Sequence, residues 1–126
     1  MYNIKYNYLF GGIFFIKWIS FDDQYILLEE LYEDSFYPDF LIDKIKYLLE
    51  DFINFVEQKP KNMADVGDKI YDLIQNANSL QYEFLDNDSE YDNIARECLI
   101  RNLEYIIQWF HLPINLEEAL AEREWD

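Results

Sequence analysis

One acidic stretch of the chain has the residue types and spacing of a calcium-binding loop. In DNDSEYDNIARE, acidic residues fall at positions 1, 3, 5, 7 and 12 of an EF-hand count, namely Asp86, Asp88, Glu90, Asp92 and Glu97. Carboxylate oxygens at this spacing are ligands that calcium prefers. The stretch therefore makes calcium or another hard cation one candidate ligand.

Two positions of this stretch depart from the calcium-loop pattern. Position 6, where the sharp turn needs glycine, holds Tyr91, and position 8 holds the polar Asn93. A capping box made by Ser89 and Asp92 would start a helix here, and acidic residues stabilise a helix N-terminus through its dipole. We therefore prefer a capped helix start and assign no metal site.

The single histidine and single cysteine restrict the remaining chemistry. A zinc site of His and Cys ligands cannot be assembled from one copy of each. Cys98 lies on an apolar helical stripe, which predicts a buried small hydrophobe, and His111 lies in a last helical turn, where a cation complements the helix C-terminus. Gly11 and Gly12 are followed by neither a P-loop lysine nor a dinucleotide-binding spacing.

Adjacent carboxylates are abundant, but a sequence with 26 acidic residues supplies them by composition alone. A carboxylate becomes a catalytic acid or base only when its environment shifts its pKa. The sequence therefore predicts no catalytic residues, no cofactor and no enzymatic activity.

The composition predicts one folded, strongly acidic domain. The 126 residues carry a net charge of −16, and 51% of them are hydrophobic, so the chain can bury a core despite its charge. Basic residues are few and scattered, which argues against direct nucleic-acid binding and favours a basic protein partner. One cysteine rules out an internal disulfide framework.

The N-terminal segment, residues 1–20, is apolar and carries no acidic residue. Its uncharged run from Tyr6 to Ile16 is shorter than the about 20 residues that a membrane span requires. No small-residue cleavage site follows, so a secretory signal is not expected. The segment predicts a β-hairpin with a turn at Gly11 and Gly12, and the alternatives are a buried helix or an exposed docking segment.

From Ser20 onward the apolar residues recur at helical spacing. Capping boxes predict helix starts at Ser20, Asn62, Ser89 and Asn115, and a further helix follows Pro38. The predicted helices run over 20–33, over about 39–58, over 62–84, from 89 to Pro113, and over 115–124. The expected fold is an all-α, compact bundle of about five helices, forming one domain over 1–126 with the bundle at 21–126.

Two acidic blocks enclose a nearly neutral region. Residues 21–58 hold 11 acidic and two basic residues, and residues 86–126 hold 11 acidic and three basic residues. Such a field steers a basic partner, and exposed tyrosine and phenylalanine side chains can anchor it. The predicted partner-binding residues are Asp22, Asp23, Glu29, Glu30, Tyr32, Glu33, Asp34, Phe36, Tyr37, Asp86, Asp88, Glu90 and Tyr91.

Parts of the chain resemble an uncharacterised small bacterial domain family with a Tyr-x-Asp-x-aromatic-aromatic-Pro motif. The motif residues here are Tyr32, Asp34, Phe36, Tyr37 and Pro38, and the segments VEQKP, SLQYEFLDNDSEYDNIARE and EREWD extend the likeness over about residues 21–126. The resemblance implies a small, helical, bacterial, cytoplasmic protein and brings no catalytic or binding residues.

These observations predict a non-enzymatic interaction protein that inhibits a basic protein partner. An immunity protein, an antitoxin or a nucleic-acid-mimicking inhibitor of a bacterial or phage conflict system fits this description. The alternative is a helical protein that binds calcium or another cation.

Overall fold

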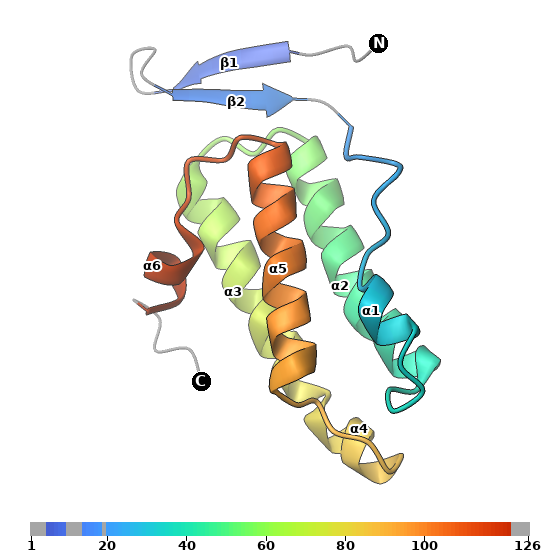
Figure 1. Cartoon of the computed structure of the whole chain (residues 1–126). Coiled ribbons are helices and arrows are strands. Elements are labelled where there is room, and N and C mark those ends of the chain that lie inside the picture. Colours follow the sequence, from blue (N-terminus) through green and yellow to red (C-terminus); the bar gives the residue numbers. More distant parts are fainter. Residues whose placement is uncertain (1–4, 10–13, 19, 122–126) are drawn as a thin grey trace.

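Three long helices form the body of the molecule. The computed structural model describes residues 5–9, 14–18 and 20–121, with side chains from residue 20 to residue 120. The long helices are α2 (Asp39–Glu57), α3 (Met63–Ser79) and α5 (Asn93–Trp109), and the short ones are α1 (Glu29–Tyr32), α4 (Gln81–Asp86) and α6 (Leu116–Ala121). In Figure 1, α2 and α5 run in one direction and α3 in the opposite one. The predicted all-α bundle is confirmed.

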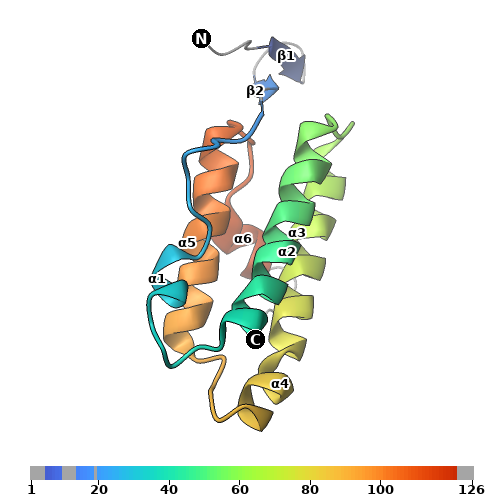
Figure 2. The same ribbon diagram turned by 90° about the vertical axis from the view of Figure 1, so that its right-hand side faces the viewer.

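The long helices form two layers around one apolar core. Figure 2 shows α2 beside α3 in one layer, and α5 with α1 in the other. Fully buried rings of Phe52, Phe84 and Phe110 come from α2, from α4 and from the end of α5. Removal of these side chains from water is the main favourable contribution to folding.

Polar side chains fix the starts of three helices. The Oδ1 atom of Asn62 accepts a hydrogen bond from the Asp65 N–H at 2.8 Å, and Asn115 accepts one from the Glu118 N–H at 2.9 Å. Both caps confirm the predicted starts of α3 and α6. The predicted start of α5 at Ser89 is wrong, because Asp92 is the cap and Ser89 is buried in the preceding loop.

The predicted helix over 20–33 is also wrong. Only α1 is helical there, and Leu28 directly before it has a left-handed backbone with φ of 57°. The Phe21 N–H donates to Glu57 Oε2 at 2.8 Å, and the Leu28 N–H donates to Asn102 Oδ1 at 3.0 Å. These distant acceptors hold residues 20–28 in a non-helical path, so tertiary contacts override the local helical pattern.

The predicted helix over 62–84 is interrupted at Leu80, where α3 ends and α4 begins. The hydroxyl of Ser79 donates to the Asn76 carbonyl at 2.7 Å, a local bond of the kind that bends helices. The helix α5 ends at Trp109, four residues before the predicted end at Pro113. Residues 122–124 of the last predicted helix lie outside the described residues.

At the N-terminus, strands β1 (Lys5–Leu9) and β2 (Phe14–Trp18) pair in antiparallel register, with Lys5 opposite Trp18 and Leu9 opposite Phe14. This is the pairing that the hairpin prediction requires. The turn predicted at Gly11 and Gly12 lies outside the described residues. Among the helices that the structure describes, none combines the length and apolarity needed to cross a membrane.

Candidate functional site

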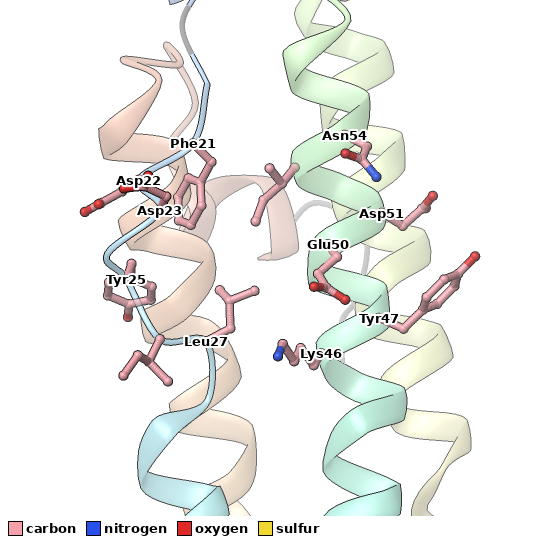
Figure 3. Close-up of a pocket in the computed structure, with 12 residues that line it drawn as sticks. Phe21, Asp22, Asp23, Tyr25, Leu27, Lys46, Tyr47, Glu50, Asp51 and Asn54 are labelled. Carbon is pink, nitrogen blue, oxygen red and sulfur yellow. The ribbon is translucent and has the colours of Figure 1, made fainter. Parts of the chain in front are cut away.

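The non-helical segment Phe21–Leu27 forms one wall of a groove, and the middle of α2 forms the other (Figure 3). The groove has a volume of about 670 Å³. Its apolar surface includes Leu27 and Ile53, each 7% exposed, together with the half-buried ring of Phe21. This size lies within the usual range of small-ligand sites.

Aromatic and polar contacts fix the wall made by the segment against α5. The Tyr25 ring stacks on the Tyr105 ring with 4.0 Å between centroids, and the Tyr105 hydroxyl donates to Asp22 Oδ2 at 2.5 Å. The Trp109 indole N–H donates to the Ser20 carbonyl at 3.0 Å. The wall is therefore positioned by side chains about 80 residues further along the chain.

The side of the groove formed by α2 carries charges of both signs. Lys46 and Glu50 lie one helical turn apart, and Figure 3 shows the Lys46 side chain pointing from α2 into the groove. The Lys46 ammonium lies 6.0 Å from the centroid of the Tyr32 ring and makes no ion pair within the described part of the chain. Asp51 pairs with Lys69 at 2.6 Å. The groove is thus acidic overall, with one cation at its side.

A second surface lies at the end of the bundle that carries α4. The hydroxyl of Tyr37 donates to Asp92 Oδ1 at 2.7 Å, which joins the loop before α2 to the start of α5. In Figure 1 this end holds α4, the start of α2 and the start of α5. We call it the α4 end; its exposed large apolar side chains are Phe36, Phe40, Tyr82, Leu85 and Ile94.

Exposed carboxylates lie among these apolar side chains. The predicted partner-binding residues that are exposed at the α4 end are Glu33, Asp34 and Phe36, between α1 and α2, and Asp86, Asp88 and Glu90, at the end of α4 and in the loop after it. Asp22 and Asp23 lie instead at the groove, and Glu29 and Glu30 lie on α1. Glu30 forms an ion pair with Arg101, whose hydrogen bond holds the pKa of the Glu30 carboxyl below its usual value.

Two of the predicted aromatic anchors are buried, so their assignment as exposed anchors is wrong. Tyr37 lies in the core with its hydroxyl on Asp92, and the Tyr91 ring packs on Phe84 and under the Arg96 guanidinium, 4.8 Å from its centroid. Tyr32 is half-buried and donates to Asp43 at 2.5 Å. Phe36 is 44% exposed, as an anchor must be.

Burial changes the acidity of these tyrosines. Burial, and secondarily the hydrogen bond to Asp92, raises the pKa of Tyr37; burial and then Asp43 do the same to the pKa of Tyr32. Burial raises the pKa of Tyr91 to about 12. Tyrosines with such a pKa stay neutral near pH 7 and are poor proton acceptors there.

The hydroxyls of Ser89 and Tyr91 have no hydrogen-bond partner among the described residues, although both are buried. A buried hydroxyl without a partner costs free energy of folding. The loop that joins α4 to α5 is therefore held by ring packing and by the Asp92 cap rather than by these hydroxyls.

One residue of the calcium-loop alternative, Asp92, has another role in the structure. Asp92 caps α5 and accepts from Tyr37, and Asp88 has a left-handed backbone with φ of 57°. The part of the chain that the structure describes has no group of three or more His, Cys, Asp or Glu residues placed to hold a metal ion. This arrangement gives the calcium alternative no support.

Cys98 is buried, as its position on the apolar stripe predicted, and burial raises the pKa of its thiol to about 12. The thiol therefore stays protonated and is a poor nucleophile. His111 is exposed after the end of α5, and its backbone, with φ of 54°, donates to the Gln108 carbonyl at 3.1 Å. The helix end is thus closed by the backbone of His111.

The sequence interpretation missed two sets of residues that shape the groove. One is Asn102, a buried polar residue of α5 that holds the backbone of Leu28. The feature of the sequence that could have revealed it is a single amide side chain within the apolar stripe of α5. The other is the set of α2 residues that line the groove, Lys46, Tyr47 and Glu50, which look like an ordinary solvated helix face.

Comparison with curated proteins and with solved structures found no match for the chain. The model of a family of unknown function, DUF5713, matches residues 21–125, which include both walls of the groove and the whole α4 end. This range agrees with the resemblance over about residues 21–126 and leaves the strands β1 and β2 outside. The chain belongs to the DUF5713 family of unknown function.

Proposed function

We propose that this protein is a non-enzymatic inhibitor that binds a basic protein partner through the α4 end. The observation that carries the proposal is the mixture of exposed apolar side chains and carboxylates at that end. Exposed aromatic and aliphatic groups contribute binding energy at the centre of an interface, and surrounding charges steer association and select the partner.

The charge of the whole chain supports this proposal. Three ion pairs join described residues, while the sequence carries 26 acidic residues and a net charge of −16. Most of the carboxylates that the structure describes are exposed and lie outside these ion pairs, so they contribute to a strong negative field. Such a field accelerates the encounter with a basic protein and repels acidic ones.

Within this class of inhibitor, the proposed role is that of an immunity protein, an antitoxin or a nucleic-acid mimic that acts in the cytoplasm. The target of such an inhibitor is a basic toxin or nuclease whose substrate is itself a polyanion. Exposed carboxylates such as Asp34, Asp86 and Glu90 would take the positions of phosphates in that target's site. Because this binding is largely electrostatic, it would weaken steeply as the salt concentration rises.

The test is a pull-down of tagged protein from lysate of the source cell at low and high salt, followed by mass spectrometry. The charge-reversal variant Asp86→Lys with Glu90→Lys changes two exposed residues of the α4 end. The matched control, Asp72→Lys with Glu104→Lys, makes the same change of net charge at exposed positions on α3 and α5.

The proposal expects a basic protein that is retained at low salt, is released at high salt, and is lost with the α4-end variant but kept by the control. Purified target should then lose its activity when the wild-type protein is added. Equal loss of the partner with both variants would remove the α4 end from the proposal, and retention independent of salt would exclude electrostatic mimicry.

A further inference from the structure

The groove between Phe21–Leu27 and α2 is separate from the α4 end and has its own chemistry. Its floor is apolar, since Leu27 and Ile53 are nearly buried. The half-buried ring of Phe21 lies beside this floor, whereas Figure 3 shows the Tyr47 side chain directed away from the segment. The surface can therefore take up an apolar side chain.

Two carboxylates of the groove are available to a ligand. Asp22 and Asp51 are already engaged, by the Tyr105 hydroxyl and by Lys69. Asp23 accepts one hydrogen bond, at 3.1 Å from its neighbour Gln24, and is exposed. Glu50 is exposed and has no hydrogen bond or ion pair with another described residue. Asp23 on the segment and Glu50 on α2 thus each keep acceptor capacity for a ligand.

We propose that this groove binds a basic amphipathic segment of the protein partner. An apolar side chain of that segment would enter between Leu27 and Ile53, and lysine or arginine side chains beside it would contact Asp23 and Glu50. The charge complementarity of the groove selects this occupant, because a second copy of the chain would bring another net charge of −16. The inference rests on the proposed function and adds a second contact to it.

Lys46 allows a test in which a substitution should strengthen the binding of the basic segment instead of weakening it. It is the one basic residue among those that line the groove, and its ammonium repels a cationic ligand. The change Lys46→Gln should therefore strengthen binding about threefold, the size expected for one partly exposed charge. Lys61→Gln removes the same charge from an exposed position in the α2–α3 loop and should leave binding unchanged.

The probe is a fluorescently labelled 14-residue helix-forming peptide of lysine and leucine, with its affinity measured by fluorescence anisotropy on the full chain. Glu50→Lys should weaken binding about tenfold, because it replaces an attraction by a repulsion. Asp72→Lys is the matched charge reversal outside the groove and should have less than a twofold effect. A peptide with serine in place of leucine tests the apolar floor.

Preferential binding of the leucine peptide, lost with Glu50→Lys and strengthened with Lys46→Gln, supports the inference. Equal binding of the serine and leucine peptides, or equal effects of Glu50→Lys and Asp72→Lys, overturns it, because charge alone would then explain the binding. The pull-down reports independently on the proposed function. A basic partner that is retained equally by wild type and by Glu50→Lys leaves the α4-end proposal in place and removes the groove.

Discussion

Among the polar side chains of the fold, Asn102 should make the largest single contribution to the free energy of unfolding. Its side chain is nearly buried, with the residue 4% exposed, and it makes three hydrogen bonds inside the protein, one of them to the Cys98 Sγ at 3.7 Å. Its Oδ1 accepts from the Leu28 N–H at 3.0 Å, and its Nδ2 donates to the Cys98 carbonyl at 2.8 Å. The first bond spans 74 positions of sequence and fixes the segment at its left-handed residue.

The change Asn102→Ala removes the acceptor and leaves the buried Leu28 N–H without a partner. An unsatisfied buried group costs about 1–3 kcal/mol, and the cavity left by the amide adds to it, so the free energy of unfolding should fall by about 2–4 kcal/mol. The loss of the Cys98 contact adds less, because an α-helical carbonyl keeps its backbone partner. Urea unfolding followed by circular dichroism measures the change.

The matched control is Asn54→Ala, which truncates an exposed asparagine on α2 and should change stability by less than about 0.5 kcal/mol. Hydrogen exchange of the Leu28 amide supplies a local measurement, and it should become faster in Asn102→Ala by more than exchange in the centre of α3. If Asn102→Ala unfolds within about 0.5 kcal/mol of wild type and the Leu28 amide stays protected, Asn102 does not hold the segment.

Three further predictions concern the buried titratable groups. Tyr91→Phe should raise the free energy of unfolding by about 1 kcal/mol, because it deletes a buried hydroxyl without a described partner, and a loss of stability in urea would show that this hydroxyl is bonded. The folded-state pKa of Tyr37 and of Tyr91 lies above the ordinary 10.0, so their contribution to stability is complete below pH 10 and is lost as the pH rises above it. Melting temperatures measured from about pH 8 to 12 should therefore fall above pH 10, less steeply in Tyr37→Phe than in wild type, and equal slopes would contradict the assignment. The Cys98 thiol should react with a disulfide reagent only after unfolding, since it is buried with a pKa of about 12, and fast labelling of the native protein would contradict its burial.

Local sequence patterns were sufficient to predict a helix where the residues that start it, end it or form its apolar face lie within the helix or next to it. The helix α2 follows Pro38 and keeps apolar residues at spacings of three and four from Leu41 to Val56, so its existence could be read directly. The start of α3 was predictable for a similar reason, because the cap of Asn62 lies within three residues of the N–H that it accepts from.

The errors occur where the deciding partner is distant in the sequence. Ser20 and Asp23 form a valid capping pattern, yet residues 20–28 are held by Glu57 and Asn102, 36 and 74 positions away. In the stretch DSEYD, both Ser89 and Asp92 could cap a helix, and the burial of Ser89 leaves this role to Asp92. Tyr37 looked like an exposed anchor because its acceptor, Asp92, lies 55 positions further on.

The first of these errors also explains why the sequence did not predict the groove. A helix over 20–33 would bond its own backbone and would leave Asn102 buried without an N–H to accept from. The non-helical path instead gives the Leu28 N–H to Asn102, buries Leu27 and makes Phe21–Leu27 the wall of the groove that faces α2. The groove therefore exists only while tertiary contacts override the helical pattern of this segment. Weakening of the Asn102 contact should loosen the segment and lower the affinity for the lysine–leucine peptide, even though Asn102 does not line the groove.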